Sequence, residues 1–166
     1  MMGVTHAACG AFLGAAAGAA AGEPATGAWV AALAALLPDI DHPGSLVGRR
    51  IPVLPVLISA LAGHRGITHT VWFCAGIAAL AGFLAAPAGM GTAVLVAACA
   101  LVGGLSHLAL DGLTLSGVAP FAPVALPGRL ARLNHIRGPV RTGTGLIEGP
   151  VSLLLIVLTM QVCGII

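Results

Sequence analysis

The sequence predicts an all-α membrane helix bundle with about four full spans and a short second helix. Hydrophobic residues make up 58% of the 166 residues, charged residues make up only 7%, and the mean hydropathy is +1.06. A soluble domain of this length would carry about a quarter charged residues. Residues 1–166 are therefore predicted to form a single integral membrane domain.

Apolar runs and the residues that interrupt them set the helix boundaries. The first predicted span covers residues 6–22 and ends in a turn at residues 23–27. Residues 28–37 are apolar, but they are fewer than the ~20 residues of an ordinary span. They predict a short second helix, which Pro38 and Pro43 prevent from continuing.

The next apolar segment, residues 51–63, contains Pro52 and Pro55. These prolines favour an interfacial or re-entrant path over a regular span. Residues 68–86 follow as an uninterrupted apolar run and predict a full span.

The C-terminal half has the same pattern of apolar runs and breakers. A proline- and glycine-rich segment at residues 87–91 precedes a span at residues 92–113. Residues 114–144 form a long loop with four arginines, and residues 146–166 are the last span.

Nearly all acids and histidines fall within a few short polar clusters. Of the five acids only Glu23 lies outside them, and of the six histidines only His135 does. Ionisable groups in an apolar medium are costly and mark functional sites, and imidazoles and carboxylates bind metal ions. The candidate metal ligands are His6, Asp39, Asp41, His42, His64, His69, His107 and Asp111.

One topology brings these clusters to the same membrane face. If the first span begins at that face with His6, the short second helix returns to it and delivers Asp39. The span at residues 68–86 then begins at this face near His69, and the span at residues 92–113 returns to it and ends near His107. This agreement requires the second helix to cross and residues 51–63 not to cross.

The arginines indicate which face this is. All seven arginines lie in segments assigned to it, namely Arg49, Arg50, Arg65, Arg129, Arg132, Arg137 and Arg141. Basic residues in short loops favour the cytoplasmic side. Arginine also suits the binding of an anionic substrate, because its planar fork of donors matches a phosphate.

Each motif also has a purely structural interpretation. His107 and Asp111 lie four residues apart on one helix face, where they can bind a metal or simply hydrogen-bond and stabilise the bundle. The two aspartates after Pro38 repel one another unless a cation or an arginine lies between them. Glu148 can serve as a ligand, a base or a helix-start carboxylate.

Gly10, Gly14, Gly18 and Gly22 recur at every fourth residue of the first span. Such a ridge of small residues lets another helix approach closely, either within the chain or in a homo-oligomer. His6 continues the ridge by one turn and is expected to point into the bundle.

The combined motifs resemble the bacterial and archaeal inner-membrane metal-dependent hydrolases, a family that includes the LexA-regulated YdjM-like membrane proteins. The motifs are Thr5-His6 with Gly10, LLPDIDHP at residues 36–43, HRGITH at residues 64–69, and GLSH at residues 104–107 with Asp111, Thr114 and Gly117-Val118. The resemblance covers most of the chain and implies a multi-span protein with hydrolase activity. The motif order is more distantly similar to zinc-dependent phospholipase C. That similarity implies a zinc cluster held by His6, Asp39 or Asp41, His64 or His69, His107 and Asp111.

The sequence therefore predicts a hydrolase of the inner membrane that cleaves an ester or phosphoester at the cytoplasmic interface, on a phospholipid or another lipid phosphate. One or two Zn²⁺ ions, or another divalent metal, would activate water. Candidate catalytic residues are His64, His69, Asp39, Arg65 and Glu148, while Arg65, Arg137 or Arg141 would steady negative charge. No nucleic-acid partner is expected. The alternative is a non-enzymatic metal-binding or transport protein.

Overall fold

A computed structural model describes the chain except for residues 52, 54, 57–65 and 144. The described part is helical and contains two isolated β-bridges but no β-strand, which confirms the predicted all-α class for these residues. The main helices are α1 (Gly3–Ala19), α2 (Pro24–Ala34), α4 (Val71–Ala85), α5 (Met90–Gly112) and α6 (Glu148–Val162). Short 3-10 turns are η1 (Pro38–Asp41), η2 (Gly48–Arg50), η3 (Ile67–His69), η4 (Ala86–Ala88) and η5 (Gly128–Leu133).

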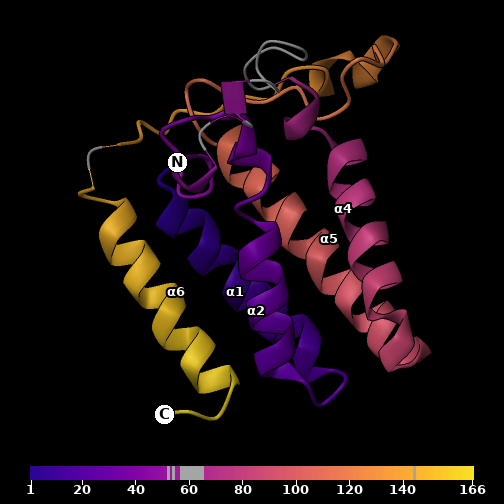
Figure 1. Ribbon diagram of the computed structural model, residues 1–166. Coiled ribbons are helices and arrows are strands. Elements are labelled where there is room, and N and C mark those ends of the chain that lie inside the picture. The colour runs from indigo at the N-terminus through magenta and orange to yellow at the C-terminus, as the bar shows by residue number, and fades with distance from the viewer. Residues whose placement is uncertain (52, 54, 57–65, 144) are drawn as a thin grey trace.

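The five main helices lie side by side and alternate in direction (Figure 1). Helices α1, α4 and α6 start at the end of the bundle where the N-terminus lies, and α2 and α5 end there. The turns η1, η2, η3 and η5 are gathered at this same end, whereas the C-terminus lies at the other.

Two helical stretches, Val71–Ala88 and Met90–Gly112, are long and apolar enough to cross a membrane. The apolar helices α1 and α6 have 17 and 15 residues, and α2 has 11. At 1.5 Å per residue α2 extends roughly 16 Å, about half of a bilayer core. Length and composition thus identify two candidate spans, and the four that the sequence predicts are not confirmed.

Helix α2 starts and ends earlier than predicted. Pro24 occupies its first turn, where the missing amide hydrogen costs nothing. The helix ends at Ala34, and Pro38 then begins η1. Most of the segment 51–63, for which an interfacial path is predicted, lies outside the described residues.

Glycines allow the central helices to approach at backbone distance. A Cβ on Gly14 of α1 would overlap the backbone of Gly27 in α2, and a Cβ on Gly103 of α5 would overlap Ala31 of α2. Gly10 and Gly18 likewise face α2, while Gly22 lies in the following turn at φ +74° with open space around it. The predicted glycine ridge is therefore filled by α2 of the same chain along three of its four positions.

A candidate metal centre

The described helix ends and turns bring five of the candidate ligands together at the N-terminal end of the bundle. His6 comes from the first turns of α1, Asp39 from η1, His69 from η3, and His107 and Asp111 from the end of α5. Their side chains are at most 1% exposed except that of Asp39, which is 20% exposed. Five ionisable groups are thus held almost entirely out of water.

The ring of His107 is oriented by the backbone carbonyl of Ala35, the residue that follows α2. Its Nδ1 lies 2.7 Å from the carbonyl oxygen of Ala35. Since a carbonyl only accepts, Nδ1 carries the hydrogen and donates it. The lone pair of Nε2 then points toward Asp39 Oδ1 at 3.8 Å and Asp111 Oδ2 at 3.7 Å.

His69, in η3, approaches the same two carboxylates, those of Asp39 and Asp111. Its Nδ1 is 3.1 Å from the hydroxyl of Thr68 and 4.0 Å from Asp41 Oδ2. Its Nε2 lies 3.6 Å from Asp39 Oδ1 and 3.7 Å from Asp111 Oδ2. The two histidines therefore present their Nε2 atoms to one shared pair of carboxylate oxygens.

His6 completes the cluster on the side of α1. Its ring stacks on that of His107 with centroids 3.7 Å apart and planes at 16°. His6 Nε2 is 3.4 Å from Asp111 Oδ1, and the amino group of Met1 donates to the same oxygen at 2.9 Å. Asp111 therefore has one oxygen turned to His6 and the other to His69 and His107.

These residues form two overlapping groups with the spacing of a metal site. His6, His107 and Asp111 form one group, and Asp39, His69 and His107 form the other, each with ligand atoms within 4.8 Å of one another. In a tetrahedral zinc site with bonds of about 2.0–2.2 Å, ligand atoms lie roughly 3.3–3.6 Å apart. The histidine nitrogens lie 3.4–3.8 Å from the carboxylate oxygens, close to these values.

The hydrogen-bonding pattern also fits a cation. Within the described part of the chain, both ring nitrogens of His6 and the Nε2 atoms of His69 and His107 make no hydrogen bond of ordinary geometry, although all are buried. Buried polar atoms are normally paired. Metal-binding histidines, by contrast, bond through one nitrogen to the protein and leave the other for the metal, which is the arrangement of His107.

Asp39 is the most accessible member of the cluster. Burial alone would raise the pKa of its carboxyl group, but the His69 ring beside it and the nearby rings of His107 and His6 outweigh burial. The pKa of Asp39 is therefore held below its ordinary value. An ionised carboxylate at the accessible side is available to a metal ion or to a cationic group.

The other predicted site residues that the structure describes lie outside these two groups. Asp41 is buried beside His69, and His42 is exposed. Glu148, at the start of α6, accepts hydrogen bonds from the backbone amides of Met2 at 2.6 Å and Gly143 at 2.7 Å. His64 and Arg65 fall outside the described residues.

Three contributors to the cluster could not be recognised in the sequence. The Ala35 carbonyl and the Met1 amino group are main-chain atoms, and no residue type marks them. Thr68 is not the cap of α4, because Thr70 accepts there from the Phe73 amide. Thr68 instead contacts His69.

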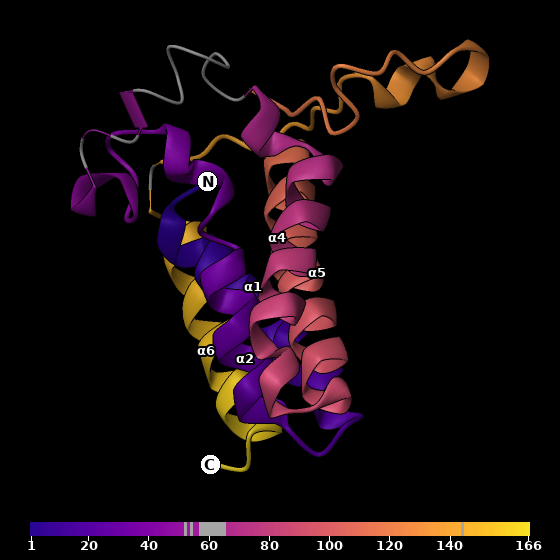
Figure 2. The same ribbon diagram turned by 45° about the vertical axis from the view of Figure 1, so that its right-hand side comes forward.

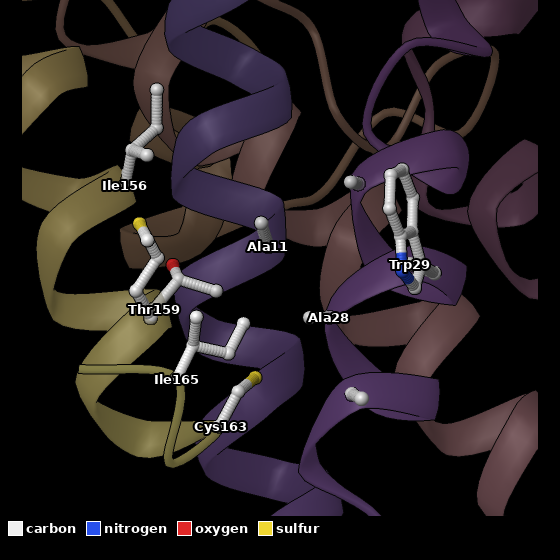
Figure 3. A pocket seen from close by; sticks show the side chains of 10 residues that line it. Ala11, Ala28, Trp29, Ile156, Thr159, Cys163 and Ile165 are labelled. Carbon is white, nitrogen blue, oxygen red and sulfur yellow. The ribbon is translucent and has the colours of Figure 1, made fainter.

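A hollow of about 260 Å³ lies near the opposite end of the bundle. Figure 3 shows side chains around it from α1, α2, α6 and the segment after α6, including Trp29, Ile156 and Ile165. Its lining is apolar and carries no charged residue. This hollow therefore offers neither a histidine nor a carboxylate to a metal ion.

The sequence model of the YdjM inner membrane protein family matches residues 1–165. The chain belongs to this family. The YdjM inner membrane protein of Escherichia coli is 42% identical over 109 residues, which are 65% of this chain and 55% of that protein. The uncharacterized protein YvsG of Bacillus subtilis is 32% identical over 108 residues, which are 65% of this chain and 64% of YvsG.

The YdjM family name places its members in the inner membrane, in agreement with the predicted location. The matched segments span less than two thirds of the length of these two curated relatives. No solved structure matches the chain.

Proposed function

We propose that this YdjM family member is a metal-dependent hydrolase that cleaves an ester or phosphoester of a membrane lipid. The residues that would hold the metal are His6, Asp39, His69, His107 and Asp111, with Zn²⁺ as the first candidate. The two ligand groups have His107 in common, and together they would suit one ion or two.

The orientation of His107 carries the proposal. Because Nδ1 gives its hydrogen to Ala35, the lone pair of Nε2 faces two carboxylate oxygens without a hydrogen between them. Three acceptors turned toward one another repel unless a positive charge lies among them. A divalent cation supplies that charge, and a second proton on the ring is the competing explanation.

The position of the cluster supports a lipid substrate. His107 and Asp111 lie in the last turns of α5, one of the two helices long enough to cross the membrane. A group at the end of such a helix lies near the level of lipid headgroups, where ester and phosphoester bonds are found. We further propose that α1, α2 and α6 also lie within the membrane.

The side of the membrane follows from the arginines. Every arginine in the described residues belongs to a segment at the cluster end of the bundle (Figure 1). Such segments favour the cytoplasm, which supports a site on the cytoplasmic face.

A divalent metal supplies Lewis acidity that activates water and polarises the bond to be cleaved. The protein residues would fix its position: Ala35 orients His107, and Thr68 lies against the outer nitrogen of His69. Asp39 faces the accessible side and would meet the substrate first. His64, Arg65 and Glu148 stay candidate catalytic residues on sequence grounds alone.

Metal analysis of the purified protein tests the metal site. Mass spectrometry of protein prepared without chelator should find at least one divalent metal per chain. His107→Ala and Asp111→Ala should lose most of it, and Asp111→Asn guards against a folding defect. The matched control is His135→Ala, which removes an exposed histidine from a loop. Full metal content in both cluster variants would refute the ligand assignment.

A second experiment separates the enzyme from a non-enzymatic metal protein. The metal-loaded protein in lipid nanodiscs should release product from a phospholipid or a polyprenyl phosphate, and His107→Ala should not. A protein that binds metal but converts neither lipid would favour the structural or transport alternative over the hydrolase.

A further inference from the structure

Residues 119–135, here called the basic arm, leave the bundle at the cluster end and extend sideways across the helix direction (Figure 2). Val118 and Ile136 close the base of the arm by exchanging two backbone hydrogen bonds of 2.8 Å. The side chain of Asn134 links its two sides by bonding the amide and the carbonyl of Leu126, at 2.8 and 3.1 Å. The arm is thus held in a defined shape.

The base of the arm is fixed at the level where α4 begins. The carbonyl of Pro120 accepts from the Val71 amide at 2.8 Å, and the carbonyl of Phe121 accepts from the Trp72 indole at 3.4 Å. Trp72 is half exposed on the first turn of a helix long enough to cross the membrane. Tryptophan at such a helix end marks the headgroup level, so the arm leaves the bundle at that level.

The charge of the arm is uncompensated. Residues 112–147 contain four arginines and no acid, and all four arginines are exposed: Arg129, Arg132, Arg137 and Arg141. None of them forms an ion pair with another described residue. Val124 and Leu130 on the same arm are each 51% exposed. Arginines interleaved with exposed apolar side chains are typical of segments that lie in a membrane surface.

We propose that the basic arm lies on the membrane surface and binds anionic phospholipid headgroups through Arg129 and Arg132, while Val124 and Leu130 enter the headgroup boundary. An anionic lipid surface fits because it supplies the negative charge that the arm lacks and is present at the level where the arm emerges. The arm makes this contact without any residue of the His/Asp cluster, so the proposal does not depend on metal binding.

A fluorescent label on the arm tests this directly. Leu130→Cys, in a background with Cys9→Ala and Cys163→Ala, carries an environment-sensitive dye, while Cys74 and Cys99 are buried. In nanodiscs the dye should report an apolar environment when phosphatidylglycerol is present and a more aqueous one in phosphatidylcholine alone. Raised salt should reverse the change, since it screens exposed charges.

The double variant Arg129→Gln/Arg132→Gln should weaken this association. Each arginine near an anionic surface contributes about five-fold to the equilibrium constant for association of the arm with the membrane. Losing both should lower that constant roughly 25-fold. The matched control Arg49→Gln/Arg50→Gln removes the same charge from η2 and should leave the dye signal unchanged. An equal signal in neutral and anionic nanodiscs, or an equal loss in the control, would overturn the proposal. Metal content should be unchanged in both double variants.

Discussion

The imidazole Nδ1 of His107 donates a hydrogen bond of 2.7 Å to the carbonyl of Ala35, 72 residues earlier in the chain. This bond links the last turns of α5 to the end of α2, and it turns Nε2 toward two carboxylates. The orientation of a candidate metal ligand therefore depends on how closely two helices pack.

Gly103 controls that packing, one turn before His107. A Cβ at this position would overlap the backbone of Ala31, so Gly103→Ala must push α2 and α5 apart. Overpacking of this kind costs about 1–3 kcal/mol, and it should lower both the unfolding temperature and the metal content. Gly76→Ala on α4, where a Cβ meets open space, is the control and should change neither. If Gly103→Ala kept the metal content of the wild type, metal binding would not depend on how α2 and α5 pack.

The contact between α1 and α2 gives a second packing prediction. Gly14 and Gly27 face each other so closely that a Cβ on either would overlap the other's carbonyl. Gly14→Ala and Gly27→Ala should each destabilise the protein by about 1–3 kcal/mol, measured by denaturant unfolding in detergent micelles. Gly91→Ala in the first turn of α5 has open space and should be nearly neutral. The effect should not depend on protein concentration, because both glycines pack within one chain.

Helix periodicity predicted part of the cluster well. The four-residue spacing of His107 and Asp111 places both on one face of α5, and the structure turns both toward His6. The glycine ridge pointed His6 inward, and His6 is fully buried. These residues lie on regular helices, where sequence spacing determines direction.

The turns could not be predicted in the same way. The sequence leaves open which of Asp39 and Asp41 faces the candidate metal site, since both follow Pro38 within three residues. In the structure Asp39 approaches the Nε2 atoms of His69 and His107, and Asp41 lies on the other side of His69. This choice is set by how η1 and η3 pack on the helix ends, which no local pattern encodes.

Glu148 is expected to stabilise the fold rather than bind metal. Its carboxylate accepts from the amides of Met2 and Gly143, so it joins the start of α1 and the preceding loop to α6. Glu148→Ala leaves those amides unpaired, at a cost of about 1–3 kcal/mol. The variant should melt at a lower temperature but keep its metal when folded. Glu23→Ala, which removes an exposed acid bonded to Thr26, should have little effect. Loss of metal without loss of stability in Glu148→Ala would instead make Glu148 a ligand.

Removing the metal should destabilise the folded protein through the same cluster. A ligand that binds only the folded state stabilises it by about 2.7 kcal/mol when present at 100 times its dissociation constant. A chelator should therefore lower the unfolding temperature of the wild type, and added Zn²⁺ should restore it. The effect should weaken as pH falls, because protons compete with the metal for histidine nitrogens and carboxylates. His107→Ala should show no response to chelator or Zn²⁺, whereas His135→Ala should respond like the wild type. A wild-type protein whose unfolding temperature ignores both treatments at neutral pH would favour a second proton on His107 as the charge that holds the two carboxylates together.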